Sequence, residues 1–353
     1  MHSRYDMRAI ADLGRDLLIK HGMPRDKAEA VAEVLVRGEG FGKTTHGLAL
    51  LPAYLAEIAR GGMNVAGEPR VIHDHGACLT WDGRKLPGPW LVQQAVRTGA
   101  ERAERYGIAI VSLYNSHHTA CLSAYLQAAT DKGLVIFIAL TDPGHSSVAP
   151  FGGTGAVMTS NPVALGAPTG DGPVLIDMST ALATNGAVAL RRQTGAQFPY
   201  PVLLDNQGRP SADPAVMATN PPGTIMPLGG VEAGHKGYAL GLMVEILSGC
   251  LSGGGRAEPH EGWSASMTIT LYSPQAMGGS QAYLKQIDAL VRACRDSPPK
   301  PGFERVMLPG ERALNALKDC QNRGIPLPVS LCGQLDELAR AHGLTMPTPV
   351  ANG

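Results

Sequence analysis

Two short segments of this chain carry the residue types best suited to moving a proton. In the first, Lys43-Thr44-Thr45-His46-Gly47-Leu48-Ala49, His46 is predicted to lie at the start of a helix. In the second, Asn115-Ser116-His117-His118, His118 comes just after a predicted strand. Because the charge of imidazole changes most readily near neutral pH, it suits general acid–base catalysis. The sequence therefore predicts one buried site served by His46 and His118.

Each histidine also has a simpler interpretation. A helix start disfavours imidazolium and favours anions, so His46 is either part of a site or a capping or surface histidine. His117 and His118 point to opposite sides of an extended chain, which leaves at most one of them facing a site. Adjacent histidines chelate a metal poorly, and no carboxylate cluster accompanies them. We expect no metal.

A lysine between glycines is a third candidate. In Gly234-His235-Lys236-Gly237, Lys236 is predicted to lie at the start of a buried apolar helix over residues 238–251. There it would hold a phosphate or a carboxylate, unless the segment is only a packing loop.

Two phosphate-binding motifs are excluded. Gly42-Lys43-Thr44 resembles the end of a Walker A loop, but Arg37 stands where that motif needs glycine, and the preceding segment has helical periodicity. No Gly-x-Gly-x-x-Gly opens a helix after a strand, so a standard Rossmann fingerprint is absent.

The composition of the 353 residues limits the partners. The 30 lysines and arginines equal the 30 aspartates and glutamates, so no net field favours nucleic acid or a membrane. The 6 cysteines show no Cys-x-x-Cys spacing, which favours reduced thiols in a cytoplasm. The N-terminus lacks the apolar region of a signal peptide, and the run over 238–251 is too short for a span of ~20 residues. We expect a soluble, cytoplasmic protein.

Helical periodicity dominates both ends of the chain, and strand–helix alternation fills its middle. Three helices are predicted in the first ~60 residues, the third from near Gly47, and two more over 312–324 and 329–342. Between them, strands are predicted near 71–72, 78–81, 108–113, 134–141, 174–178 and 267–272, with helices over 89–106, 121–129, 238–251 and 281–294. This pattern predicts an α/β protein in which the two ends, residues 1–70 and 296–353, form one helical domain. Residues 71–295 form the α/β domain, which leaves room for a smaller subdomain.

Taken together, the motifs resemble the malate/L-lactate dehydrogenase family of the second type, over roughly residues 5 to 340. That family includes the Δ1-piperideine-2-carboxylate/Δ1-pyrroline-2-carboxylate reductases. The matching segments, in order, are Thr45-His46-Gly47, Leu51-Pro52-Ala53-Tyr54, Asn115 to His118, Pro150-Phe151-Gly152-Gly153, Ser160-Asn161-Pro162-Val163-Ala164, Asp177-Met178-Ser179-Thr180, Asp205 with Gly208 and Asp213-Pro214, Pro227-Leu228-Gly229-Gly230, Gly234-His235-Lys236-Gly237 and Leu308-Pro309-Gly310-Glu311. Each segment alone is a weak signal, but ten in the right order are a strong one.

The resemblance implies a non-Rossmann mixed sheet that binds NADH or NADPH, a small-molecule substrate and a homodimer. It implies His46 as the catalytic histidine. We expect His46 to donate the proton, with His118 as the alternative donor and the Thr45 hydroxyl orienting His46 or the substrate. The cofactor contacts that it implies are His118, Asn161, Pro162, Asp177, Met178, Ser179, Thr180, His235, Lys236, Pro309, Gly310 and Glu311.

The implied substrate pocket, which includes Leu50, Tyr54 and Thr44, departs from the family pattern. The arginine that grips a substrate carboxylate is replaced by Leu50, and a polar residue by Thr44. Thr119, Ala120 and Ala187 also replace the family's usual residues. Leucine cannot form the bidentate contact of arginine. We expect a substrate that lacks that carboxylate and is less acidic or bulkier, such as an apolar ketone or a cyclic imine. The alternative is that another cation, such as Lys43 or Arg191, binds the carboxylate.

The sequence therefore predicts an NAD(P)H-dependent oxidoreductase that reduces a C=O or C=N bond of a 2-oxo acid or a cyclic imine in an altered pocket. Because Leu50 and Ala187 replace family residues, the alternative is a member of the family that binds the cofactor but has lost turnover.

Overall fold

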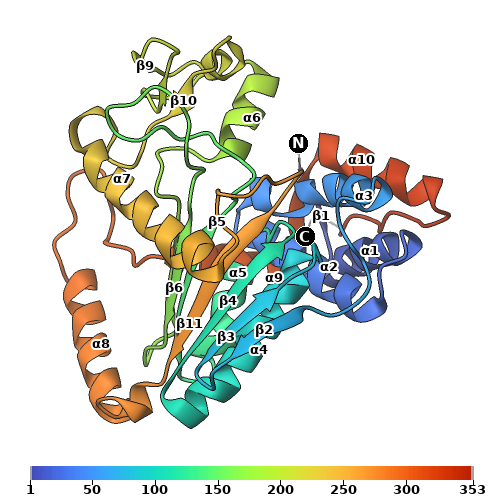
Figure 1. Ribbon diagram of the computed structural model, residues 1–353. Helices are drawn as coiled ribbons and strands as arrows, with labels where there is room; N and C mark the ends of the chain where they lie inside the picture. The colour runs from blue at the N-terminus through green and yellow to red at the C-terminus, as the bar shows by residue number, and fades with distance from the viewer. Residues whose placement is uncertain (1, 351–353) are drawn as a thin grey trace.

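The computed structural model describes residues 2–350, and a seven-stranded sheet forms its centre (Figure 1). The strand order is β2-β3-β4-β11-β5-β6-β7, in which β3 and β4 are parallel and all other neighbours are antiparallel. These strands are β2 (Arg70–Asp74), β3 (Cys78–Asp82), β4 (Ile108–Ser116), β5 (Val135–Thr141), β6 (Val163–Ala167), β7 (Val174–Met178) and β11 (Ala265–Tyr272). A Rossmann sheet is built from successive parallel strands, so the expected non-Rossmann mixed sheet is confirmed.

Central strand β11 is covered on both sides, as its nearly uninterrupted run of buried residues requires. Helices α4 (Gly88–Tyr106) and α5 (Ser123–Thr130) pack on the sheet, and their apolar side chains share one core with β4, β5 and β11. Helix α7 (Gly230–Glu245) lies on the opposite side, and α8 (Ser280–Arg295) stands at the edge (Figure 1).

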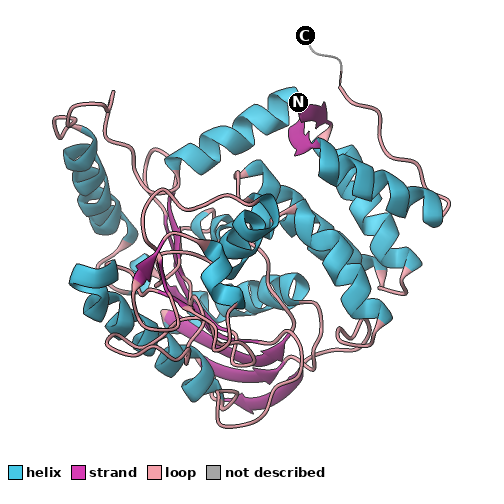
Figure 2. Cartoon of the chain, turned by 90° about the horizontal axis from the view of Figure 1, so that it is seen from above, coloured by secondary structure: helices cyan, strands magenta, loops and turns pink. Residues whose placement is uncertain are grey.

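The two ends of the chain pack together, as the sequence predicts. Strand β1 (His2–Tyr5) pairs antiparallel with β12 (Ile325–Pro328), with Tyr5 opposite Ile325. Around this pair lie α1 (Met7–Lys20), α2 (Arg25–Gly40), α3 (Leu51–Ala59), α9 (Glu311–Arg323) and α10 (Val329–Ala341). Figure 1 shows these helices together at one side of the sheet, and Figure 2 shows helices close to the N-terminus. The exact domain boundaries at residues 70 and 295 stay a prediction.

A smaller unit beside α7 has its own apolar core. Helix α6 (Asn185–Thr194) and the short strands β8 (Leu203–Leu204), β9 (Pro210–Ser211) and β10 (Thr224–Ile225) build it. Its buried residues include Val148, Met158, Val188 and Ile225. The unit rises above the carboxyl end of β5, so it forms one wall of the space beside that strand end (Figure 1).

Three local predictions are wrong. No α-helix starts near Gly47, because two 3₁₀ turns, η1 (Thr44–His46) and η2 (Leu48–Leu50), precede α3. The helix predicted over 238–251 begins at Gly230 and continues into a π-helical turn, η4 (Ile246–Cys250), so Lys236 lies in its second turn rather than at its start. Nor is this helix buried, since Met243 is 45% and Ile246 55% exposed. Within residues 2–350, every helix is too short or too polar to cross a membrane.

Candidate active site

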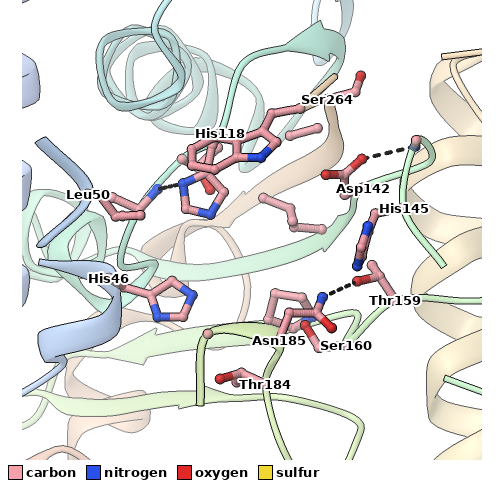
Figure 3. A pocket seen from close by; sticks show the side chains of 18 of the residues that line it. His46, Leu50, His118, Asp142, His145, Thr159, Ser160, Thr184, Asn185 and Ser264 are labelled. Atoms are coloured by element: carbon pink, nitrogen blue, oxygen red, sulfur yellow. Dashed lines mark hydrogen bonds between the residues drawn. The ribbon is translucent and has the colours of Figure 1, made fainter. Parts of the chain in front are cut away.

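A cavity of about 560 Å³ opens between the helical ends, the sheet and the smaller unit (Figure 3). His46, Leu50 and His118 line one side of it, while Asp142, His145 and Ser160 lie across from them. A second cavity of about 220 Å³ adjoins it and shares Thr45, His46, Ser160, Pro162 and Thr184 with the first. The two histidines that the sequence singles out therefore meet in one site.

The turn that carries His46 is anchored by a buried carboxylate from α2. The Glu39 Oε2 atom accepts a hydrogen bond from the Leu48 N–H at 3.0 Å. A Cβ atom at Gly47 would lie 2.3 Å from that oxygen, so only glycine lets the carboxylate approach so closely. Burial raises the pKa of Glu39 to about 7. His46 is therefore placed by Glu39 and Gly47 rather than by a helix start.

His46 and Thr45 contact one another inside this turn. The Thr45 Oγ1 atom lies 3.0 Å from His46 Nδ1, which leaves Nε2 as the free ring nitrogen. Burial lowers the pKa of His46, Asp177 opposes that change by attraction, and Lys43 adds to it by repulsion. Gly186, at the start of α6, lets that helix come close, because a Cβ there would lie 3.2 Å from the Thr45 Cβ.

The tautomer of His118 is fixed by its neighbours. Its Nδ1 accepts a hydrogen bond from the Ala120 N–H at 3.2 Å and lies 2.8 Å from the Tyr54 hydroxyl oxygen. The neutral ring therefore carries its proton on Nε2, the nitrogen that faces the cavity in Figure 3. Burial, reinforced by repulsion from His46, lowers the pKa of His118 to about 3. His118 is a neutral hydrogen-bond donor, 5.9 Å from His46 between ring centroids.

His117 faces away from the site, as the alternation along an extended chain predicts. Its side chain is completely buried and its Nε2 lies 3.4 Å from the Glu57 carboxylate. Burial lowers the pKa of His117 to about 4 despite that carboxylate. Tyr54 and Thr44, which the sequence places in the pocket, do not line it. Tyr54 is buried behind His118, and Thr44 points to solvent.

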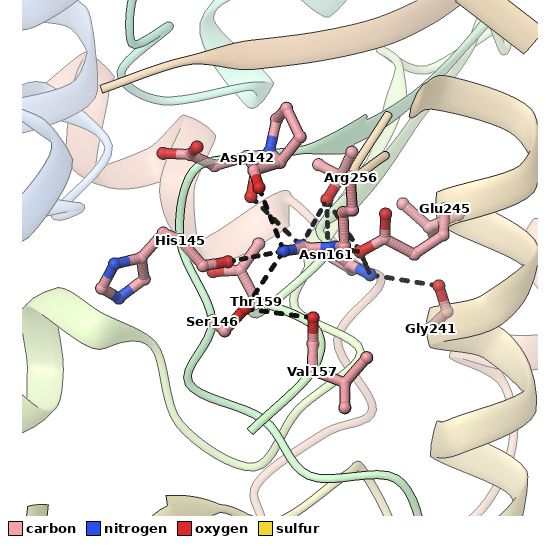
Figure 4. A network of polar contacts seen from close by, with 12 residues as sticks. Asp142, His145, Ser146, Val157, Thr159, Asn161, Gly241, Glu245 and Arg256 are labelled. Atoms are coloured by element: carbon pink, nitrogen blue, oxygen red, sulfur yellow. Dashed lines mark hydrogen bonds and ion pairs between the residues drawn. The ribbon is translucent and has the colours of Figure 1, made fainter. Parts of the chain in front are cut away.

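The far wall of the cavity is held by a polar network that the sequence analysis missed (Figure 4). Arg256 pairs with Glu245 at 2.8 Å. It also donates to the carbonyl oxygens of Asp142 at 3.1 Å and His145 at 2.9 Å. Burial raises the pKa of Asp142. The network fixes the loop after β5 that gives Asp142 and His145 to the cavity.

Asn161 belongs to this network and is fully buried. Its Nδ2 donates to Glu245 Oε1 at 2.9 Å and to the Gly241 carbonyl at 3.1 Å, and its Oδ1 accepts from Thr141 Oγ1 at 2.9 Å. It is one of a few non-glycine residues with positive φ, at 38°. Such a strained backbone persists where the surroundings enforce it. Asn161 therefore shapes the wall that Ser160 and Pro162 present to the cavity.

The predicted cofactor residues fall into three groups. Asp177, Met178 and Ser179, at the end of β7, line the smaller cavity together with Pro162. Thr180 follows them and is buried, with its hydroxyl donating to the Asn161 carbonyl at 3.0 Å. The other two groups, His235 with Lys236 and Pro309 with Gly310 and Glu311, line neither cavity.

The elements that carry these outlying groups contact β7 or the residues just after it. Pro309 accepts a hydrogen bond from the Leu175 N–H of β7 at 3.2 Å. In α7, a Cβ at Gly241 would lie 3.5 Å from the Thr180 hydroxyl oxygen, so that helix runs past the end of β7. Lys236 is exposed on α7 and pairs with no carboxylate in residues 2–350. The ammonium group of Lys236 fits the phosphates of a dinucleotide. The hydroxyl of Ser179 and the apolar side chains of Pro162 and Met178 fit its riboses and ring.

Comparison with known proteins identifies the family. The sequence profile of the malate/L-lactate dehydrogenase family matches residues 5–336. An L-lactate dehydrogenase of Cupriavidus necator is 32% identical over 355 residues, covering 98% of this chain and 99% of the relative. The chain therefore belongs to the malate/L-lactate dehydrogenase family, and the resemblance seen in the motifs is confirmed.

Solved structures agree with this assignment. Malate dehydrogenase from Entamoeba histolytica shares the fold, with a TM-score of 0.91 at 23% identity, covering 99% of this chain and 100% of that one. A Δ1-piperideine-2-carboxylate reductase from Pseudomonas syringae gives a TM-score of 0.84 at 25% identity, covering 95% of this chain and 99% of that one. This protein is accordingly an oxidoreductase of a pyridine-nucleotide-dependent family, with a small-molecule substrate.

Proposed function

We propose that this protein uses NADH or NADPH to reduce the C=O or C=N bond of a small 2-oxo acid or cyclic imine, with His46 as the proton donor. The observation that carries the proposal is the pair of imidazoles in one cavity, 5.9 Å apart between ring centroids. Burial lowers the pKa of both rings, but only at His46 does a carboxylate, that of Asp177, oppose this lowering. Reduction makes the heteroatom of the substrate basic, and an adjacent imidazolium protonates it.

The two histidines have different tasks in this proposal. His46 carries the transferred proton on Nε2, because its Nδ1 is held by the Thr45 hydroxyl at 3.0 Å. His118 stays neutral and donates a hydrogen bond from Nε2 to the substrate heteroatom, which orients the bond to be reduced. Repulsion between the two rings keeps one positive charge, not two, on the pair.

The cofactor would lie along the end of β7. When bound, the reduced nicotinamide supplies the hydride. Pro162, Met178 and Ser179 would hold it at the smaller cavity, and Lys236 would meet its phosphates. We assign Asn161 and Thr180 to shaping this wall from behind, because both side chains are buried and hydrogen-bonded.

The experiment is a titration with NADH and NADPH, followed by a panel of substrates. Nucleotide fluorescence measures binding, and loss of nicotinamide absorbance measures turnover on 2-oxo acids, cyclic imines and oxo-acid/amine mixtures. Binding with turnover on at least one class supports the proposal. Binding without turnover on any class favours the alternative, a family member that has lost its activity.

We further propose a homodimer, with α7 and η4 at the interface. Exposed apolar side chains at three- and four-residue spacing follow this helix, namely Ala239, Leu242, Met243 and Ile246, and Leu251 extends the row. Ile246 and Leu251 are 55% and 62% exposed. Monomeric proteins rarely expose such a contiguous apolar stripe, and a second copy would cover it.

Light scattering during gel filtration tests the dimer. Ile246→Glu places a charge in the stripe, so we expect it to yield monomers. Leu190→Glu, at a 49% exposed position on α6, is the matched control and should leave the dimer intact. A monomeric wild type, or a dimer that persists in Ile246→Glu, overturns this interface.

A further inference from the structure

We propose that Arg60 binds the carboxylate of the substrate and so takes the place of the family arginine that Leu50 replaces. This inference rests on the function proposed above, because it assigns a residue to the substrate of that reaction. It commits the substrate to carrying a carboxylate.

Arg60 lies at the cavity that holds the two histidines. Arg60 directly follows α3, and its side chain reaches the cavity that His46, Leu50 and His118 also line. Its Nη2 would lie 3.3 Å from a Cβ at Gly262, so the guanidinium borders the segment that carries Trp263. The Trp263 ring lies 5.1 Å from that of His118 between centroids. Of the described residues that line this cavity, Arg60 is the one with a permanent positive charge.

An ion pair with Glu57 orients the side chain of Arg60. Its Nη2 donates to Glu57 Oε1 at 2.5 Å, and the side chain of Glu57 is only 9% exposed. A Cβ at Gly62 would lie 2.3 Å from Glu57 Oε2, so Gly62 leaves room for this carboxylate. Glu57 therefore orients one side of the guanidinium, whose other N–H groups have no acceptor among residues 2–350. The side chain is 58% exposed, and its free donors suit a bidentate contact with a carboxylate.

The other candidate cations either lie outside the larger cavity or are bound to other groups of the protein. Lys43 lines the smaller cavity beside Asp177 and does not reach the larger one. Arg191 stacks on Phe198 at 4.6 Å and donates to the Gln197 carbonyl, on the outer side of α6. Lys43 and Arg191 are the two replacements that the sequence suggests. Arg256 donates to the loop after β5 and pairs with Glu245.

Asp142 is the acidic group that an incoming carboxylate would meet in the same cavity. Its Oδ1 accepts a hydrogen bond from the Gly144 N–H at 2.9 Å. Burial raises the pKa of Asp142. Arg60 supplies the positive charge that favours an incoming carboxylate in this cavity.

The test separates charge recognition from turnover. Calorimetry with the NADH complex measures the affinity of oxamate, an inert 2-oxo acid analogue, and of its uncharged amide, oxamide. In parallel, kcat/KM is measured for 2-oxo acids of three to six carbons and for their amides. We expect Arg60→Gln to weaken oxamate binding about 10- to 100-fold, the usual size of a hydrogen bond to a charged group, and to leave oxamide within about 2-fold.

Three further variants and one control variant sharpen the result. Arg60→Lys keeps the positive charge but not the planar, bidentate guanidinium, so it should give an intermediate loss of affinity for oxamate. Leu50→Arg in the Arg60→Gln background should restore part of the affinity for oxamate. Glu57→Gln/Arg60→Gln removes both partners of the ion pair and replaces Arg60→Gln if that variant unfolds. Arg70→Gln, which removes an exposed arginine paired with Asp82 at 3.3 Å, is the matched control.

The outcomes also separate this inference from the proposed function. Carboxylate binding by Arg60 is refuted if Arg60→Gln binds oxamate as tightly as wild type does, or if it loses affinity for oxamate and oxamide equally. It is also refuted if the wild type binds no oxamate. A wild type that binds oxamate through Arg60 but reduces no substrate supports carboxylate binding by Arg60 and refutes the proposed function. If wild type and Arg60→Gln reduce amides and acids alike, the proposed function stands and carboxylate binding by Arg60 is refuted.

Discussion

Replacing Glu39 by glutamine should stabilise the protein at alkaline pH. The carboxylate of Glu39 is 5% exposed and receives the Leu48 N–H, and burial raises its pKa to about 7. In the unfolded chain its pKa returns to 4.5. At roughly 1.4 kcal/mol per pH unit, this difference corresponds to about 3 kcal/mol.

The direction in which the folding stability changes with pH follows from proton binding to Glu39. Between pH 4.5 and 7 the folded chain holds a proton on Glu39 that the unfolded chain has lost. The stability that this proton provides is complete below pH 4.5 and is lost as the pH rises through 7. Glutamine does not titrate, yet its side-chain oxygen still accepts the Leu48 N–H. Relative to wild type, Glu39→Gln should therefore gain about 2 to 3 kcal/mol between pH 5 and pH 8.

Urea unfolding at pH 5 and pH 8, followed by tryptophan fluorescence, measures this gain. Glu33→Gln, at an exposed position of the same helix, is the matched control. A stability difference between Glu39→Gln and wild type that is the same at both pH values would refute the reasoning. It would mean that Glu39 does not keep its proton when the turn of His46 is folded.

The remaining predictions concern the site. His46→Gln should lower kcat by ~100-fold or more, the usual size of general acid catalysis, and near wild-type turnover in a folded variant would remove His46 from its role. In the wild type, kcat/KM for reduction should fall as the pH rises, with its inflection below 6.5, because burial lowers the pKa of His46. Lys236→Ala should weaken binding of NADPH in a fluorescence titration without changing the fold, and unchanged affinity would make Lys236 structural. Arg256→Gln leaves Glu245 without its ion-pair partner, so it should cost about 2 to 3 kcal/mol in urea unfolding and raise KM more than it lowers kcat.

Much of the scaffold could be predicted because its signals are local. Strand β4 is a run of β-branched and apolar residues, and α4 has proline near its start. The start of α3 also has a local signal, since Pro52 lies in its first turn, a position that proline favours. That signal places the helix start after Gly47. Gly47 is instead required by the approach of Glu39, which no local pattern reveals.

The rest depends on contacts between residues far apart in the chain. Arg256 donates to the Asp142 carbonyl 114 residues earlier, and Lys43 and Arg191 are as plausible as Arg60 until their positions are known. The position of Asp142 did carry one usable signal, because it follows a strand end, where ligands bind in open sheets. The apolar run in α7 was predicted to be buried because hydrophobicity does not tell whether the same chain or a second copy covers it.

The helix that we place at the dimer interface also supports the wall of the cavity. Ile246 points outward from the end of α7, whereas its neighbour Glu245 is buried and pairs with Arg256. Arg256 in turn holds the loop that gives Asp142 and His145 to the cavity. A π-helical turn begins directly after Glu245, and such turns are frequent at functional sites. A second copy seated on Ile246 would therefore fix α7 at the point from which the far wall of the active site is held.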